Sequence, residues 1–181
     1  MDRDSGSGRE DTSSLEGCIP SLRRYGRSLS RNQQDVDDLV HDCLVRALEQ
    51  LHTHREAGDL RPWLFAIMHN LFVSRFRHAR RRGRVEALDA VPEASFAQPP
   101  TQEMRAETQR VWEALYTLPP EQRSVLVLVA VEDLSYADAA RVLKVPIGTV
   151  MSRLARARER LACAMETGTM KTGIGTRAGK R

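Results

Sequence analysis

The stretch Leu134–Leu161, LSYADAARVLKVPIGTVMSRLARARERL, decides the fold. Its pattern predicts two helices joined by a tight turn, and the second helix is longer and rich in arginine. Ser135 is a good N-cap with Asp138 three residues on, and Lys144–Pro146 form the turn. This shape is typical of a helix-turn-helix, whose second helix enters the major groove of DNA. A helical hairpin that touches no DNA is the alternative.

The second helix of this stretch carries groups that suit DNA on its outward side. Val150 and Leu154 face the core, and Ser152, Arg153 and Arg156 fall on or near the opposite face. Arginine can pair bidentately with guanine, and serine can bond a base or a phosphate. The free amides at the start of the helix, at Gly148 and Thr149, can hold a phosphate.

The segments just ahead complete a small helical domain. Residues 105–116 predict a helix, and Pro119 and Pro120 end it and start another. That next helix runs through QRSVLVLVAV, which is apolar almost all round and predicts the buried centre of the domain. Residues 83–102 lack a sustained period and carry three prolines, so they predict a linker to whatever precedes them.

The clearest helix of the first half is predicted for residues 33–52, QQDVDDLVHDCLVRALEQLH. Its apolar residues recur at spacings of three and four, which gives one apolar face. A stripe of carboxylates runs beside that face at helical spacing. The stripe is either a solvated acidic face or a docking surface for a basic partner. Its members are Asp35, Asp38, Asp42 and Glu49.

A second helix of the first half is predicted from Pro62, which suits a first helical turn, to about Arg82. One side of it lines up an aromatic ring, an amide and guanidinium groups. A ring can stack on bases, an amide can read a base edge and guanidinium groups hold phosphates, as single-stranded nucleic acid requires. The alternative is that the ring belongs to the core and the arginines solvate a helix end. The residues in line are Trp63, Ala66, Asn70, Ser74, Arg77 and Arg81.

Composition sets the broad class. The 181 residues suffice for one ordinary domain or two small ones, and 41% hydrophobic with 29% charged residues exclude a chain that is disordered throughout. The net charge of +4 is unevenly placed, because residues 75–84, RFRHARRRGR, are dense in arginine whereas residues 1–16 lean acidic. This asymmetry indicates a polyanionic partner at particular surfaces.

Several other classes are excluded by what the sequence lacks. The three cysteines form no CxxC pair, which suits a reducing cytosol. His52 and His54 have no third or fourth ligand, so neither a metal nor a cofactor is expected. No apolar run approaches the ~20 residues of a membrane span, and the N-terminus is not a signal peptide. No acid, base and nucleophile converge as an enzyme would need, so the sequence predicts a cytoplasmic protein that neither catalyses nor enters the membrane.

The residues then resemble a known family, the sigma-70-family RNA polymerase specificity factors of the small extracytoplasmic-function type. The resemblance covers residues 18–82 and 104–162. Three motifs carry it in order, namely DVDDLVHDCLVRAL, RPWLFAIMHNLFVSRFR and LPPEQRSVLVLVAVEDLSYADAARVLKVPIGTVMSRLARARERL. It implies an all-α fold of two small helical domains, a sigma region 2 bundle and a sigma region 4 helix-turn-helix, on a flexible linker. The implied division is residues 1–14 as a disordered lead-in, 15–82 as region 2, 83–103 as the linker, 104–164 as region 4 and 165–181 as a basic disordered tail.

The resemblance also implies roles for the first half. The acidic stripe would dock on the clamp helices of the polymerase largest subunit. The loop before Trp63, including Leu60, would hold a flipped non-template base of the −10 element together with Asn70. Contacts to phosphates as the duplex opens would come from Arg75, Arg77, Arg80 and Arg81.

In the second half, the positions that face the −35 element in the family are Met151, Ser152, Ala155 and Arg156. Met151 stands where relatives often have a basic residue, so the contact there is apolar or absent. The turn Leu143–Val145 lacks the glycine that such turns favour. The linker would thread toward the polymerase active cleft and the RNA exit path.

The expected function is therefore that of a sigma factor. It would bind core RNA polymerase at the clamp helices and flap, place it on promoter DNA and help melt the duplex. Factors of this class are usually held inactive by an anti-sigma factor, often at the membrane, and join the nucleoid when active. Two alternatives are a stand-alone helix-turn-helix regulator, which would dimerise and need no acidic helix, and a sigma-like decoy that binds an anti-sigma factor and never engages DNA.

Overall fold

The computed structural model describes residues 5–54, 59–81 and 102–173. Helices occupy nearly all of these ranges and no strand occurs in them, so the predicted all-α class is confirmed. Residues 82–101, most of the predicted linker, lie outside the described part of the chain. The elements are α1 (Ser5–Leu29), α2 (Gln33–His54), α3 (Leu60–Arg81), α4 (Gln102–Tyr116), α5 (Pro120–Leu126), the π-helix η1 (Val127–Val131), α6 (Tyr136–Leu143) and α7 (Ile147–Gly173).

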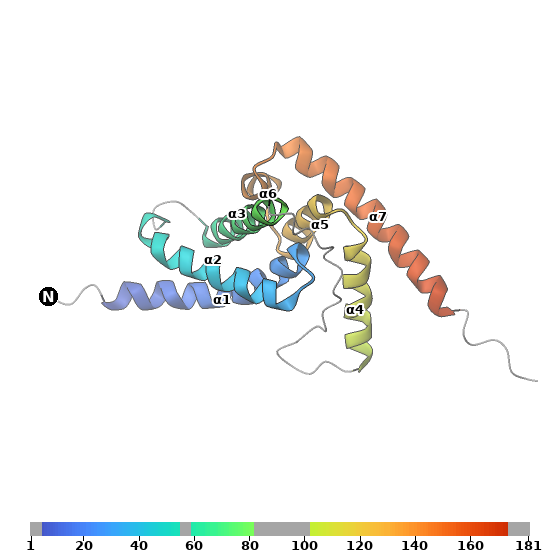
Figure 1. The fold of residues 1–181 in the computed structure, drawn as a ribbon, viewed down its shortest axis with the longest axis horizontal. Helices are drawn as coiled ribbons and strands as arrows, with labels where there is room; N and C mark the ends of the chain where they lie inside the picture. Colours follow the sequence, from blue (N-terminus) through green and yellow to red (C-terminus); the bar gives the residue numbers. More distant parts are fainter. Residues whose placement is uncertain (1–4, 55–58, 82–101, 174–181) are drawn as a thin grey trace, which may run out of the picture.

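The first half is a bundle of α1, α2 and α3, which pack pairwise against one another (Figure 1). The apolar face predicted for α2 lies inward, and its Val36 and Cys43 are buried. From α3, Phe65 is buried beside Tyr25 of α1, with ring centroids 5.3 Å apart in an edge-to-face arrangement. Edge-to-face aromatic pairs add specific geometry to the burial of apolar area, so they fix how α1 and α3 cross.

Close packing in this bundle depends on Gly26 of α1. A Cβ added there would lie 2.9 Å from Cγ1 of Val36 and 3.0 Å from Cε of Met68. We therefore expect Gly26→Ala to lower the free energy of unfolding by about 1–3 kcal/mol, as overpacking does. Gly17 of the same helix has nothing within 4 Å of its added Cβ, so Gly17→Ala should instead raise stability by about 0.5–1 kcal/mol. Urea titrations of both variants check this, and equal midpoints would contradict the close contact.

The second half contains the predicted helix-turn-helix, formed by α6 and α7. Ser135 caps α6, because its hydroxyl accepts a hydrogen bond from the Asp138 N–H at 3.0 Å. The turn closes without glycine because Lys144 adopts the left-handed conformation, with φ 54° and ψ 45°. The amides of Lys144 and Val145 bond back to the carbonyls of Arg141 and Ala140, as in a Schellman motif. These bonds offset the backbone cost of about 1–2 kcal/mol that a left-handed non-glycine residue carries.

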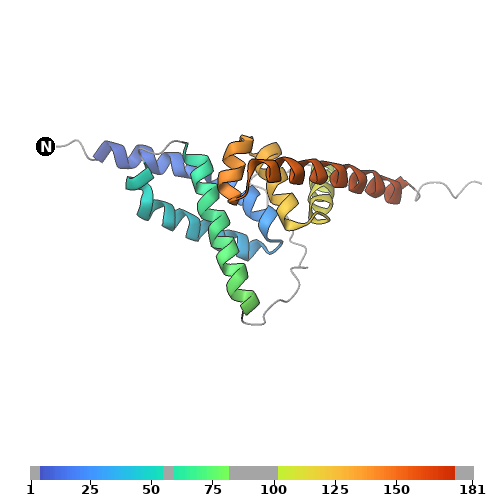
Figure 2. The same ribbon diagram turned by 90° about the horizontal axis from the view of Figure 1, so that it is seen from above.

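The two halves pack against each other. Helix α1 contacts α5 and η1, α3 contacts α6, and one apolar core runs through both halves. Figures 1 and 2 show α6 beside α3, while α4 and the end of α7 project away from the body. Polar groups also cross the boundary, since the Tyr116 hydroxyl donates to the Arg27 carbonyl at 3.0 Å and Arg31 donates to the Tyr116 carbonyl at 3.2 Å. The linker therefore joins two domains that are in contact in this structure.

The predicted ends of the chain differ from the structure. Helix α1 begins at Ser5 and passes through Pro20, so residues 5–14 of the expected lead-in are helical. Helix α7 continues to Gly173, into the expected tail at 165–181. Nucleation is the costly step of helix formation, so a helix that has already formed extends into neighbouring residues at a small further cost. Residues 1–4 and 174–181 lie outside the described ranges.

Candidate nucleic-acid interface

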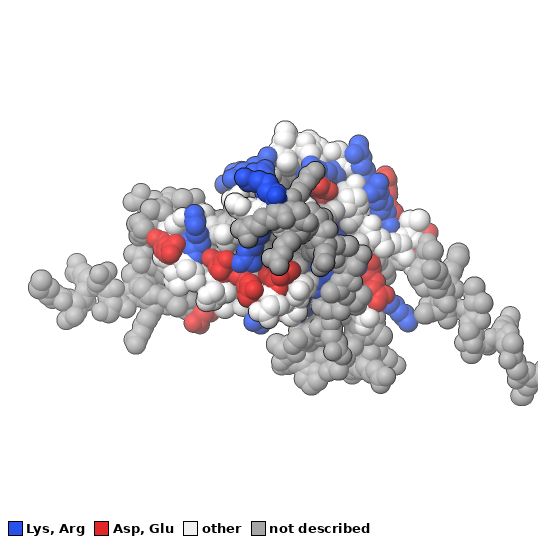
Figure 3. All heavy atoms as spheres, in the orientation of Figure 1, with Lys and Arg blue, Asp and Glu red and all other residues white. Residues whose placement is uncertain are grey.

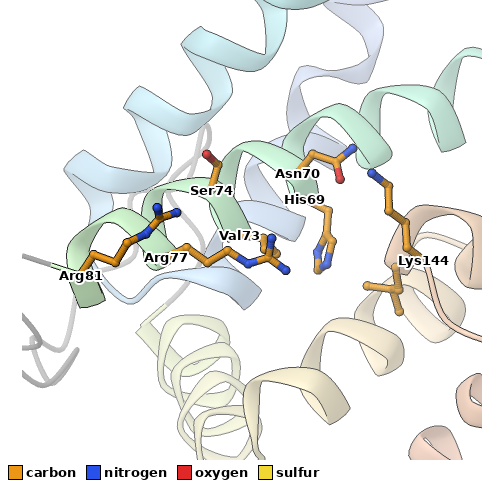
Figure 4. A pocket seen from close by; sticks show the side chains of 8 residues that line it. His69, Asn70, Val73, Ser74, Arg77, Arg81 and Lys144 are labelled. Atoms are coloured by element: carbon orange, nitrogen blue, oxygen red, sulfur yellow. The ribbon is translucent and has the colours of Figure 1, made fainter.

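One face of α3 opens on a cavity of about 410 Å³ between the two halves. Figure 4 shows the side chains spaced along α3, with Lys144 reaching toward Asn70 from the turn of the helix-turn-helix. The structure thus brings together four of the six residues that the sequence placed in line, and it adds groups from the second half. The lining residues are His69, Asn70, Val73, Ser74, Arg77, Arg81, Leu143 and Lys144.

The cavity is strongly cationic. Arg77, Arg81 and Lys144 line it, and none of its lining residues is acidic. Such a concave surface with charge of one sign attracts polyanions. His69 adds no charge, because burial first, and then the charges of Lys144 and Arg153, lower its pKa from the usual 6.5 to about 4. Its Nδ1 lies 2.9 Å from the Tyr25 hydroxyl, which holds the ring in place.

The depressed pKa of His69 makes the packed structure sensitive to acid. Between about 6.5 and about 4 the unfolded chain binds the proton more readily than the folded one, so stability is complete above that window and falls as pH falls. We expect a loss of the order of 1–3 kcal/mol across the window. An NMR titration of the His69 ring should report the low pKa, and Lys144→Gln should move it upward. A pKa at or above 6.5 in the folded protein would contradict the buried neutral ring.

Arg75 lies on a different side of α3 from Arg77 and Arg81. Its guanidinium pairs with the Asp42 carboxylate of α2 and also donates to the Asp38 carbonyl at 3.4 Å. Two residues that the resemblance assigned to different partners, DNA for Arg75 and polymerase for Asp42, therefore bind each other here. The side chain of Arg80 lies outside the described residues.

Trp63 and Leu60 are half-buried and pack against the apolar core. Neither lines the cavity, although Trp63 and Asn70 lie seven residues apart on the same helix, as the sequence predicted. The sequence reasoning missed a different aromatic residue, Phe76, which is 44% exposed and stacks on Phe72 with centroids 6.3 Å apart. The spacing of four residues between Phe72 and Phe76 was the available signal.

The four carboxylates of the predicted stripe are all exposed along α2. Asp35 accepts from the Ser30 hydroxyl at 3.2 Å, and Asp38 accepts from the Gln34 amide at 3.1 Å. Figure 3 shows acidic side chains gathered over α2, whereas basic side chains gather over α6 and α7. The molecule therefore presents an acidic face and a basic face at different places.

The outward face of α7 has the predicted composition. Val150 and Leu154 are buried, whereas Met151 is 52% exposed. The Ser152 side chain is exposed, and its hydroxyl donates to the Thr149 carbonyl at 3.1 Å. Arg153 and Thr149 are half-buried, and the positive charge of Arg153 contributes to the lowered pKa of His69. The exposed members of the predicted set are Met151, Ser152, Ala155 and Arg156.

Sequence reasoning also missed a buried ionic link between the halves. Glu132, at the end of η1, accepts hydrogen bonds from Arg24 of α1 and Arg61 of α3. The only signal was an acidic residue that directly follows an apolar run. In the ranges that the structure covers, no three His, Cys, Asp or Glu side chains group to hold a metal ion, and no helix is long and apolar enough to cross a bilayer.

Comparison with known proteins matches both halves. The family model for Sigma-70, region 4 matches residues 108–161, and that for the Sigma2 domain of PhyR matches residues 15–69. The chain is 38% identical to the ECF RNA polymerase sigma factor EcfG of Rhodopseudomonas palustris (strain TIE-1) over 148 residues, which cover 82% of this chain and 81% of EcfG. It is 37% identical to the ECF RNA polymerase sigma factor SigM of Mycobacterium tuberculosis, over 86% of this chain and 76% of SigM.

A solved structure agrees with these matches. The sigma factor RpoE, in complex with the anti-sigma factor NepR from Bartonella quintana, superimposes with a TM-score of 0.73 at 32% identity, over 87% of this chain and 98% of that chain. This chain therefore belongs to the extracytoplasmic-function sigma factors of the sigma-70 family, and it binds core RNA polymerase and directs promoter recognition and DNA melting at the start of transcription.

Proposed function

We propose that this sigma factor divides its work among three surfaces. The acidic stripe of α2 docks on the clamp helices of the polymerase largest subunit. The face of α3 that carries Asn70, Arg77 and Arg81 takes the non-template strand of the −10 element. The outward face of α7 reads the −35 element. The observation that carries this assignment is the cationic cavity on one face of α3. The amide of Asn70 and the guanidinium groups of Arg77 and Arg81 all line it.

Promoter binding by both halves requires the packed structure to open. The −10 and −35 elements lie about 25 base pairs apart, which is about 85 Å of duplex at 3.4 Å per base pair. In the packed structure the α3 face and the turn at Lys144 line one cavity. The two halves therefore separate on the promoter, with residues 83–103 spanning between them.

Capture of flipped bases explains melting without an enzymatic step. Opening a base-pair step costs roughly 1.4 kcal/mol. Each base that stacks on the protein returns roughly 1–3 kcal/mol. A few captured bases can therefore hold a bubble, and the chain needs no catalytic group and acts by binding alone.

We further propose that an anti-sigma factor controls this chain. The sigma factor RpoE, which superimposes over 87% of this chain, was solved in complex with the anti-sigma factor NepR. Its partner would hold this chain in the cytoplasm or, where the partner is membrane-bound, at the membrane, and release would let it join the nucleoid. The decoy alternative is weaker, because the sigma factors EcfG and RpoE are 38% and 32% identical to this chain, whereas PhyR in a solved complex with NepR, which also covers both halves, is only 22% identical.

The docking surface has a direct test. Asp38→Lys should weaken binding to purified core polymerase at least tenfold, because it reverses an exposed charge of the acidic stripe. Glu113→Lys makes the same charge change on exposed α4, outside all three surfaces, and should bind as the unchanged protein does.

Run-off transcription with core polymerase and genomic DNA is the functional readout. The unchanged protein should yield discrete transcripts, and Asp38→Lys should yield them only at raised concentration. Equal core affinity of Asp38→Lys and Glu113→Lys would refute the docking role. A chain that produces no promoter-specific transcript with any core polymerase would refute the proposed function itself.

A further inference from the structure

Among the residues whose side chains the structure describes, Glu132 is the one buried acidic residue, with 1% of its surface exposed. A buried carboxylate is stable only when charged partners and hydrogen bonds replace its water. Its partners come from the other half of the molecule, so this group needs an explanation beyond the folding of the helix-turn-helix domain.

The backbone aims Glu132 at that other half. The π-helix Val127–Val131 inserts a wide turn, and the Glu132 amide bonds to the Val127 carbonyl at 2.9 Å. Asp133 follows with φ 58°, a left-handed conformation that aspartate adopts more readily than most residue types. Wide turns and left-handed residues of this kind concentrate where a side chain must be placed for function.

Two guanidinium groups surround the carboxylate. Arg24 forms a fork on it, with Nε 2.7 Å from Oε1 and Nη2 3.0 Å from Oε2. Arg61 donates through Nη2 to Oε2 and to the Glu132 backbone carbonyl, each at 3.0 Å. The Glu132 side chain is fully buried, whereas those of Arg24 and Arg61 remain 42% exposed. Two positive charges thus face one negative charge.

We propose that Arg24 and Arg61 form a phosphate-binding site for the promoter strand, which Glu132 occupies while the two halves are packed together. The inference rests on the proposed opening of the halves on the promoter. A guanidinium fork fits a carboxylate and a phosphate with the same geometry, so one site accepts either. Because Glu132 belongs to the second half, separation of the halves removes it and leaves the pair of arginines without an anion.

The position of the site favours DNA as the incoming anion. Arg61 lies between Leu60 and Trp63, in the segment to which the resemblance to the family assigns the flipped −10 base. Phosphates of that strand pass close to any base held there. This replacement of a carboxylate by a phosphate couples separation of the two halves to DNA binding. The ion pairs that Arg24 and Arg61 lose with Glu132 are regained only when a DNA strand supplies a phosphate. In the packed protein, the Glu132 carboxylate therefore occupies the site that a phosphate of the promoter strand occupies on DNA.

The first arm of the test removes the negative charge of Glu132. Glu132→Gln keeps the shape of the side chain and removes its charge, and Asp133→Asn is the matched control next to it. Small-angle X-ray scattering of the full chain should show a larger radius of gyration for Glu132→Gln alone. Its affinity for a forked −10 DNA, in the absence of polymerase, should rise at least fivefold. Circular dichroism and thermal melting confirm that each variant is folded.

The second arm tests the phosphate site in protein that already carries Glu132→Gln. Arg24→Ala and Arg61→Ala are each combined with Glu132→Gln, and Arg23→Ala is the control, because Arg23 is an exposed arginine that pairs with Asp37. Binding of holoenzyme to forked −10 DNA is measured against salt concentration. Arg24→Ala and Arg61→Ala should each reduce the magnitude of the slope of log affinity against log salt concentration by about one. Arg23→Ala should leave that slope unchanged.

The outcomes separate this proposal from the proposed function. Unchanged slopes for Arg24→Ala and Arg61→Ala would overturn the phosphate site, whereas an unchanged radius of gyration for Glu132→Gln would overturn the role of Glu132. Weaker core-polymerase binding with an unchanged DNA slope would assign the arginines to an acidic surface of the polymerase instead. Run-off transcription by the unchanged protein stands apart from all three results, and its failure alone would count against the sigma-factor function.

Discussion

Asn70→Ala should lower the yield of open promoter complexes by roughly tenfold while duplex binding by the holoenzyme stays near its normal value. Asn70 is exposed on the cavity face of α3, so its loss leaves the core of the bundle intact. An amide that bonds a base edge contributes about 1–3 kcal/mol, and that contact exists only once the base has left the stack. The loss therefore falls on melting and not on the initial encounter.

Permanganate reactivity of unpaired thymines at the −10 element measures this step. Ser74→Ala is a matched control, because Ser74 lines the same cavity and presents no group assigned to a base. It should melt the promoter normally. Trp63→Ala is a poorer test, since Trp63 packs on the apolar core and its loss would also destabilise the bundle. A normal permanganate footprint for Asn70→Ala would exclude Asn70 from base capture.

Local signals account for what the sequence predicted well. Periodicity placed α2 at residues 33–52 and the structure has Gln33–His54, because an amphipathic face is written in consecutive residues. The N-cap at Ser135 was equally local, since a cap involves residues only three apart. The shared face of Asn70, Ser74, Arg77 and Arg81 followed from helix geometry alone.

The features that the sequence did not predict depend on residues far apart in the chain. The pairing of Arg75 with Asp42 needs the crossing of α2 and α3, and the burial of Glu132 needs α1 and α3 to meet η1. Arg123 is a further example: it reads as a polar break in an apolar run, yet it is buried and donates to the Ser28 carbonyl of the other half. No periodicity reports such contacts, because each residue's partner is set by the packing of whole helices.

The packing of the halves also revises how the helix-turn-helix acts. Lys144, at the turn, was a position of uncertain geometry in the sequence, and in the structure its left-handed backbone carries it to the cavity beside α3. Arg153 is half-buried. The part of α7 that remains open to duplex DNA in the packed molecule is therefore the face of Met151, Ser152, Ala155 and Arg156.

Arg156→Ala should weaken binding to the −35 duplex by about 1–3 kcal/mol on the cognate sequence and by far less on a sequence with the contacted base pair changed. The reason is geometric: Arg156 is exposed on the same face as Ser152, and buried Val150 and Leu154 hold that face outward. Electrophoretic mobility shifts with paired cognate and altered duplexes measure the difference.

Arg158→Ala provides the control for charge, since it removes the same guanidinium from an exposed position of the same helix. It should weaken both duplexes alike and slightly, through the loss of one non-specific charge. If Arg156→Ala behaves as Arg158→Ala does, Arg156 contacts only the phosphate backbone, and recognition of the −35 element must come from Ser152 and the apolar contacts of Met151 and Ala155. If Arg156→Ala binds the cognate duplex normally, α7 does not enter the groove by this face.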